Sequence, residues 1–94
     1  MKVAGVVADF LGAVSGIATN GPDEYPDWSY RSFEKEKAEI EAVWPKIRAK
    51  LGDDTETIAL VEAKIAESFA AFAAGDKERG RDAMWAIYNS KIRD

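Results

Sequence analysis

The sequence predicts an all-α protein, a single four-helix domain of 94 residues. Apolar residues recur at the spacing of an amphipathic helix in three segments, which are residues 31–51, 54–74 and 77–92. Residues 3–18 form a fourth, more apolar segment, and glycines that suit helix ends, Gly52 and Gly75, separate the later segments. A chain of this length supports one modest core. We therefore expect one helical domain over residues 1–94, built from short antiparallel hairpins with the apolar N-terminal helix packed across them.

The first segment, residues 3–18, holds one ionisable side chain, that of Asp9. On a helix its bulky residues share one stripe and the margin of that stripe: Val3, Val6, Val7, Phe10, Leu11, Val14 and Ile17. The opposite side permits close approach of a neighbouring backbone because its residues are small: Ala4, Ala8, Gly12 and Gly16. A helix that is apolar on both sides needs cover, and we expect that cover to be protein, from this chain or another.

Two alternatives remain open for residues 3–18, contact with lipid and an export signal. Sixteen residues rise roughly 24 Å on a helix, which is less than the ~30 Å hydrocarbon layer of a bilayer. Asp9 would lie near the middle of that layer and also argues against an export signal. For Asp9 itself, one interpretation is a helix-edge residue that reaches solvent. The other is a buried polar contact, with Arg79, Arg81 or a backbone N–H, that fixes subunit register.

Residues 19–30 form the only long irregular stretch of the sequence. Asn20 and Gly21 indicate a turn, and Pro22 and Pro26 exclude a continuous helix. Aromatic and acidic side chains alternate along it, namely Asp23, Glu24, Tyr25, Asp27, Trp28 and Tyr30. The segment is either a lid whose rings cover the open end of the bundle or a recognition loop, since Tyr and Trp are favoured anchors in protein interfaces.

The second helix is expected to begin after Ser32, a plausible N-cap, and to end before Gly52. Its inward stripe comprises Phe33, Ile40, Val43, Trp44, Ile47 and Leu51. Pro45 cannot donate a hydrogen bond to the carbonyl of Glu41, so we expect a kink or two short helices that meet at Trp44.

The third helix is predicted to start at a capping box formed by Asp53 and Glu56. Its inward residues are Ile58, Val61, Ile65, Phe69 and Phe72. Gly75 and Asp76 then end it and cap the fourth helix, which implies an antiparallel hairpin. Inward residues of the fourth helix are expected to be Met84, Ile87, Tyr88 and Ile92. The stretch AAFAAGDKERGRDAMWAIY, residues 70–88, resembles one helix-turn-helix unit of tetratricopeptide-like hairpins, and the resemblance implies hairpin geometry alone.

Composition excludes several classes of function. The chain has no cysteine and no histidine, which removes thiolate ligands, cysteine nucleophiles and the commonest general base. Its net charge of −4 disfavours nucleic-acid binding, and acidic residues interrupt the basic group Lys77, Arg79 and Arg81 beside Trp85. The densest carboxylate set is expected on a solvated helix face: Glu34, Glu36, Glu39 and Glu41. We expect no catalytic residue, metal, cofactor or nucleic-acid partner.

These features favour a non-enzymatic protein–protein interaction module, such as an adaptor, an inhibitor or an assembly component. The expected partner-binding residues come from the first helix and the following loop: Val7, Phe10, Gly12, Val14, Gly16, Tyr25, Trp28 and Tyr30. We expect a cytoplasmic protein that self-associates, in the simplest case as a homodimer. The alternative is a membrane-surface protein that inserts residues 3–18 into lipid. A third hypothesis, an enzyme that uses carboxylates alone, requires two acids in one cleft.

Overall fold

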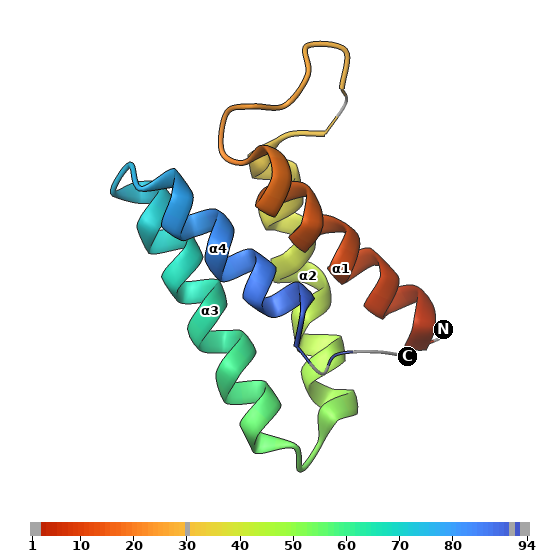
Figure 1. Ribbon diagram of the computed structural model, residues 1–94. Helices are drawn as coiled ribbons and strands as arrows, with labels where there is room; N and C mark the ends of the chain where they lie inside the picture. The colour runs from red at the N-terminus through yellow and green to blue at the C-terminus, as the bar shows by residue number, and fades with distance from the viewer. Residues whose placement is uncertain (1–2, 30, 91, 93–94) are drawn as a thin grey trace.

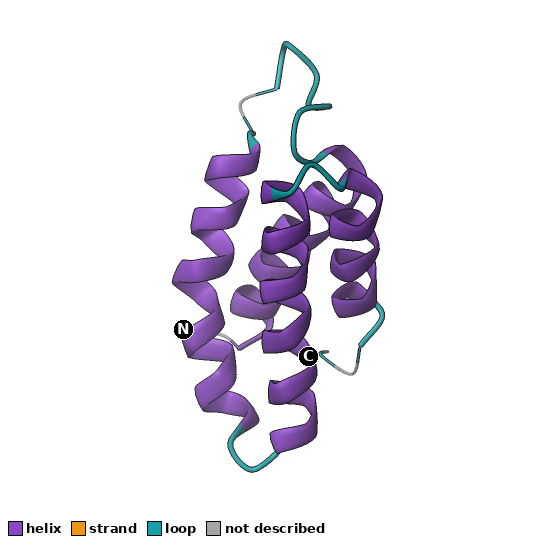
Figure 2. Ribbon diagram, turned by 90° about the vertical axis from the view of Figure 1, so that its left-hand side faces the viewer, coloured by secondary structure: helices purple, strands orange, loops and turns teal. Residues whose placement is uncertain are grey.

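The computed structural model describes residues 3–29, 31–90 and 92, and it confirms the predicted fold class (Figure 1). Its elements, in chain order, are the helices α1 (Val3–Asn20), α2 (Phe33–Leu51), α3 (Thr55–Ala73) and α4 (Lys77–Tyr88). No strand occurs among the described residues. The helices run side by side as a bundle, with the α1–α2 loop at one end and the α2–α3 turn at the other (Figure 2).

Helix α1 packs against both α2 and α4, and α3 packs against α4. This differs from the sequence-based expectation that the last three helices form one layer with the first packed across them. Among the helix pairs that are in contact, α2 and α3 have the sparsest backbone contact, and aromatic side chains bridge them. The Phe33 ring lies 6.2 Å from that of Phe69 and 5.2 Å from that of Phe72, both in edge-to-face geometry.

Helix α1 finds its cover within the chain. Phe10, Val14 and Ile17 are fully buried, and the Phe10 ring lies 5.6 Å from the Trp44 ring of α2. The small-residue side of α1 instead faces solvent at Ala8 and Gly12. Asp9 is exposed as well, which agrees with the helix-edge interpretation and contradicts a buried contact with Arg79 or Arg81. The bulky stripe of α1 is thus the centre of the core, because α2 and α4 close over it from two sides.

Helix α2 begins where the sequence predicted, since the Ser32 hydroxyl accepts a hydrogen bond of 3.2 Å from the backbone N–H of Lys35. Of the two outcomes expected at Pro45, two short helices that meet at Trp44 are wrong, because a single helix runs from Phe33 to Leu51. Glu41 and Pro45 both lie on the exposed side of this helix, where water can satisfy the carbonyl that proline leaves without a donor. Gly52 closes the helix at φ 55°, in the left-handed region that favours glycine.

Helices α3 and α4 form the predicted antiparallel hairpin. Asp54, one residue later than expected, caps α3, and Asp76 caps α4 as predicted. The buried Ser68 hydroxyl donates a 2.8 Å hydrogen bond to the Gly80 carbonyl, where the two helices are in close contact. A side chain at Gly80 would collide with the Phe72 ring, so glycine permits this approach.

The inward stripes of the hairpin were predicted only in part. In α3, Val61 and Phe72 are buried, whereas the other three predicted residues, Ile58, Ile65 and Phe69, are half-buried. Helix α4 ends at Tyr88 instead of residue 92, although Ile92 is buried as expected. Tyr88 is exposed, contrary to prediction, and its ring packs edge-to-face on Trp85 along the outer surface of α4.

Candidate interaction surface

The connection between α1 and α2 is the longest irregular segment that the structure describes, and it projects beyond the end of the bundle (Figures 1 and 2). The segment of residues 21–32 is called the α1–α2 loop below. Its first turn continues the α1 backbone, since the N–H of Gly21 donates to the Ile17 carbonyl at 2.9 Å and that of Glu24 to the Asn20 carbonyl at 2.7 Å. The side chains that hold the rest of the loop to the bundle come from two different helices.

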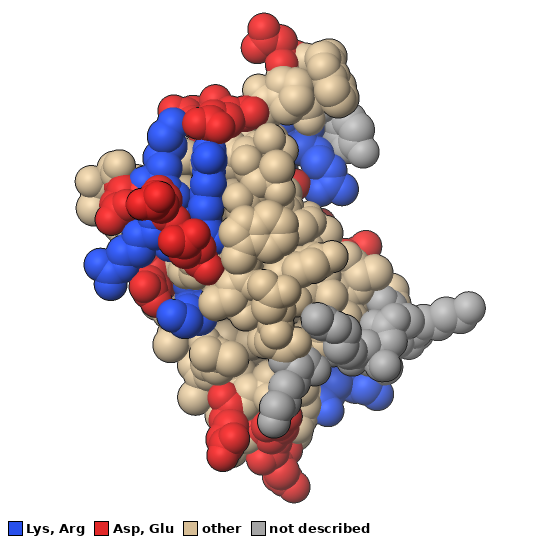
Figure 3. Space-filling view, in the orientation of Figure 1, with Lys and Arg blue, Asp and Glu red and all other residues tan. Residues whose placement is uncertain are grey.

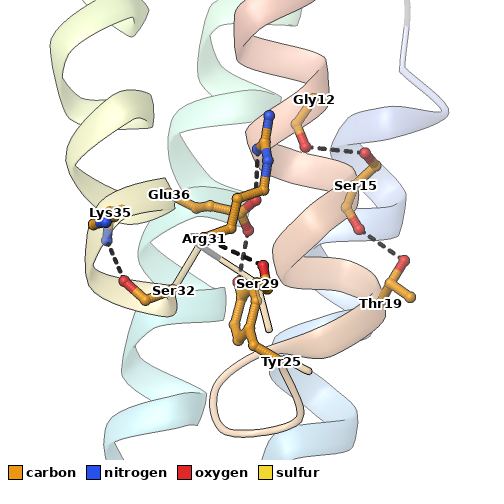
Figure 4. Close-up of polar contacts among 9 residues, drawn as sticks. All are labelled: Gly12, Ser15, Thr19, Tyr25, Ser29, Arg31, Ser32, Lys35 and Glu36. Carbon is orange, nitrogen blue, oxygen red and sulfur yellow. Dashed lines mark hydrogen bonds and ion pairs between the residues drawn. The ribbon is translucent and has the colours of Figure 1, made fainter. Parts of the chain in front are cut away.

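The first anchor of the loop is Glu36 in the opening turn of α2. Glu36 is buried, with 2% of the residue's surface exposed. Its carboxylate accepts two hydrogen bonds from the loop, one from the Tyr25 hydroxyl at 2.6 Å and one from the Arg31 guanidinium at 2.8 Å (Figure 4). Gly16 of α1 lies directly beneath this carboxylate, and a Cβ there would overlap it. The missing side chain of Gly16 therefore makes the space in which α1, α2 and the loop meet.

The carboxylate of Glu36 corrects one sequence-based expectation. It was grouped with Glu34, Glu39 and Glu41 on a solvated face, yet it is buried while the other three are exposed. Glu36 lies three residues after Phe33 and four before Ile40, so it occupies a position on the inward stripe of α2. An acid at an inward position needs a buried partner, and this was the signal that could have identified the site.

Tyr25 carries the pH dependence of this anchor. Burial, together with the hydrogen bond to the Glu36 carboxylate, raises the pKa of the Tyr25 phenol above its usual value of 10.0. A raised pKa means that the protonated phenol stabilises the fold, so this contribution is complete below pH 10.0 and is lost as the pH rises beyond it. In an absorbance titration of the wild-type chain, we expect one phenol to stay protonated above the pH range in which tyrosines usually ionise. This late-titrating phenol should be absent from the Tyr25→Phe variant. If the wild-type chain shows no late-titrating phenol, and all its phenols ionise in the same pH range as those of Tyr25→Phe, the burial of the Tyr25 hydroxyl is contradicted.

The second anchor comes from the start of α4. The Lys77 ammonium pairs with Asp23 at 3.0 Å and with Glu24 at 3.2 Å. Arg81 donates from Nε to the Gly21 carbonyl at 2.6 Å and pairs through Nη2 with Glu24 at 3.0 Å. Hydrogen bonds from Lys77 and Arg81 lower the pKa of the Glu24 carboxyl, so this anchor persists at neutral pH and weakens only as the carboxyl protonates below its ordinary value of 4.5.

The basic group that could have suggested nucleic-acid contact is thus occupied within the chain. Lys77 and Arg81 bind the loop, and the third member, Arg79, pairs with Glu67 of α3 at 3.1 Å. Figure 3 shows the result as interleaved blue and red side chains over the α3–α4 end of the molecule. This mixed surface has no continuous basic stripe of the kind that follows a phosphate backbone.

Between its anchors, the loop holds Trp28 in solvent. Trp28 is 86% exposed, the highest value among the large hydrophobic side chains that the structure describes, and its neighbours Pro26 and Asp27 are also exposed. The Ser29 N–H donates to the Pro26 carbonyl at 3.0 Å and closes a tight turn at this tip. The two described rings therefore do not form a lid, since Tyr25 turns toward Glu36 while Trp28 lies in solvent.

A groove of about 320 Å³ lies beside the loop, between α1 and the first turns of α2. It is lined by small and charged residues: Ala8, Asp9, Gly12, Arg31, Lys35, Glu36 and Glu39. Figure 3 shows the surface hollowed below the projecting loop, at the right-hand edge of that view. The groove exists because the α1 side that lines it carries small residues, Ala8 and Gly12. Charged residues of α2 form the opposite side.

The residues predicted to bind a partner have different fates. Val7, Phe10 and Val14 lie in the chain's own core, so that part of the expectation does not hold for the folded chain, because α2 and α4 already cover them. Gly12 lines the groove and Gly16 supports Glu36. Tyr25 is half-buried against Glu36 and Trp28 is exposed, while Tyr30 lies outside the described residues. Sequence reasoning missed the anchors, which are Arg31, Glu36, Lys77 and Arg81.

Within the described part of the chain, no helix is long and apolar enough to cross a membrane. The same residues contain no cluster of acidic side chains arranged to hold a metal ion. No protein-family model, curated protein or solved structure matches this chain.

Proposed function

We propose that this protein is a non-enzymatic protein–protein interaction module that docks through the tip of the α1–α2 loop, with Trp28 as its anchor. The observation that carries the proposal is the 86% exposure of Trp28 on a loop that two helices hold in place. An exposed indole has no role in this chain's own core, and tryptophan is among the residues that contribute most to protein interfaces. Adaptor, inhibitor and assembly component are the roles that such a module serves.

The anchoring of the loop supports this proposal on energetic grounds. A flexible loop loses conformational entropy when it binds, at about 0.5–1.5 kcal/mol for each side chain that becomes fixed. The contacts of Tyr25, Arg31, Lys77 and Arg81 restrict the α1–α2 loop before any partner arrives. A partner can then bind Trp28 at a lower entropic cost. This favours binding, because the loop is small.

Membrane insertion of residues 3–18, the alternative from the sequence, is less well supported. Lipid contact through the bulky stripe of α1 requires Phe10 and Ile17 to leave the core, where both are fully buried. Trp28 could meet a lipid surface, but Asp27 beside it disfavours approach to anionic headgroups. The position of Asp9 inside the first helix argues against an export signal, and so a cytoplasmic location remains part of the proposal.

Affinity purification from the native source tests the proposal. The wild-type chain should retain a specific protein, Trp28→Ala should lose it, and Trp85→Ala should retain it. Trp85 is a matched control because it is also exposed, at 39%, but lies on α4 outside the loop. Trp28→Ala should change stability by only about 0.5 kcal/mol. Trp85→Ala should cost more, about 1 kcal/mol, because the Trp85 ring also packs on Tyr88. The proposal fails if no captured protein depends on Trp28, or if the wild-type chain binds anionic vesicles through Trp28 instead.

A further inference from the structure

The tip of the α1–α2 loop carries a charge as well as an indole. A hydrogen bond from the Ser29 N–H to the Pro26 carbonyl closes a turn there. Its two central residues, Asp27 and Trp28, are both exposed. Among the residues that the structure describes, Asp27 forms no ion pair, whereas the other acids of the loop are paired with the start of α4. A partner that takes the indole therefore meets an unpaired carboxylate beside it.

The groove beside the loop has the same sign of charge. Its lining carries three carboxylates, those of Asp9, Glu36 and Glu39, and two cations, those of Arg31 and Lys35. Glu36 and Arg31 pair with each other at 2.8 Å. Asp9 and Glu39 are exposed and, within the described part of the chain, form no ion pair. A cation that enters the groove is therefore attracted by its lining, and an anion is repelled.

The groove and the tip belong to one surface. Arg31, which lines the groove, follows Trp28 by only three residues. Figure 3 shows the surface hollowed below the projecting loop, and Figure 4 shows the region where the loop joins α2 beside α1. Ala8 and Gly12 line the α1 side of the groove without bulk. A long side chain such as lysine or arginine can lay its stem against these small residues and keep its charged end among the carboxylates.

We propose that the partner is a protein with a basic binding site, in which an apolar pocket takes Trp28 and a neighbouring lysine or arginine side chain enters the groove. This inference rests on the proposed function, because it names the chemistry of the partner that Trp28 binds. Charge complementarity carries it, since the unpaired carboxylates lie at the tip and in the groove. A cation at the mouth of the pocket also favours the face of the indole. The net charge of −4 on the whole chain attracts such a partner from a distance.

Two other occupants are disfavoured by the same charges. A second copy of the chain also carries a net charge of −4, so the self-association expected from the sequence brings two acidic proteins together. A bilayer with anionic headgroups repels the exposed carboxylates for the same reason. Each of these occupants gives a result that differs from that of a basic protein.

Selection of a phage-displayed library of random peptides against the immobilised full chain tests the partner's chemistry. The selected peptides should be enriched in lysine and arginine next to apolar residues. Binding of a synthetic selected peptide should weaken at least ~30-fold in Trp28→Ala and stay unchanged in Trp85→Ala. Selected peptides without an excess of basic residues overturn the inference, and so does a selection in which no peptide depends on Trp28.

Neutral variants of the three unpaired acids test the groove and the tip separately from the indole. Asp9→Asn, Asp27→Asn and Glu39→Gln should each weaken peptide binding about two- to five-fold, as expected for exposed ion pairs. Glu41→Gln is the matched control, because Glu41 is also exposed on α2 but does not line the groove. Added salt should weaken binding to the wild-type chain more than binding to the neutral variants. Unchanged affinity in all three variants contradicts the basic partner.

The two proposals fail in different ways. If peptides depend on Trp28 but bind the neutral variants as tightly as the wild-type chain, the basic partner is wrong and Trp28 remains a binding anchor. A dimer in sedimentation velocity that Trp28→Ala dissociates identifies a second copy as the occupant and likewise overturns the basic partner alone. Binding to vesicles of anionic phospholipid through Trp28, or a Trp28→Ala chain that loses neither peptide nor protein, overturns both proposals.

Discussion

Replacing Phe10 with alanine should lower the free energy of unfolding by about 3–5 kcal/mol. Phe10 is fully buried at the centre of α1, and its ring lies 5.6 Å from the Trp44 ring of α2. Truncation removes apolar area from the core and leaves a cavity between helices that are too well packed to collapse into it. A domain of this size has roughly 5–14 kcal/mol of total stability, so the loss is a large share of it.

Urea unfolding followed by circular dichroism measures this effect, with Leu60→Ala as the matched control. Leu60 is also a large apolar residue on a helix, but it is 42% exposed, so its truncation should cost far less than that of Phe10. If Phe10→Ala costs less than about 1 kcal/mol, α1 does not form the centre of this core.

Replacing Glu36 with alanine should cost about 2–3 kcal/mol and release the α1–α2 loop. The Glu36 carboxylate is the common acceptor of Tyr25 and Arg31, and hydrogen bonds to a charged group contribute more than neutral ones. Without it, the half-buried Tyr25 hydroxyl loses its acceptor. Arg31 can turn to solvent, because its side chain is 51% exposed, which keeps the expected loss below that of a fully buried ion pair.

The matched control for this substitution is Glu39→Ala on the same helix. Glu39 is exposed, and its removal should change stability by only about 0.5 kcal/mol. Thermal unfolding gives the stability of both variants, and hydrogen exchange of the loop amides gives the local effect. Equal stability of the two variants, with unchanged exchange in the loop, would mean that Glu36 does not anchor it.

Much of the fold could be predicted because its helices carry their own signals. Ser32, Asp76 and Gly52 act at helix ends through local backbone geometry, which the sequence reports directly. The stripe through Phe10, Val14 and Ile17 in the first helix likewise required cover, and the core supplies it. The order in which the helices pack does not follow from such local signals, which is why the packing of α1 against both α2 and α4 differed from expectation.

The candidate site was predicted less well because it depends on contacts between distant segments. Lys77 and Arg81 lie more than fifty residues along the chain from the loop residues that they bind, and their charges alone do not identify Asp23, Glu24 and the Gly21 carbonyl as partners. Glu36 was hidden for a different reason. Its charged neighbours form a solvated face. In such a charge-rich segment, a single acid at an inward position is readily interpreted as one more solvated residue. For Trp28 the sequence left open whether the ring would cover the bundle or face a partner, and the structure places it in solvent.

The most direct test of the central claim, that two helices hold the α1–α2 loop in place and present Trp28, is backbone nitrogen-15 relaxation of the non-proline residues from 21 to 29. For the wild-type chain, the account predicts order parameters of about 0.85, as in the helices. In Glu36→Ala the order parameters of the loop should be clearly lower. Order parameters below about 0.6 across this segment in the wild-type chain would contradict it.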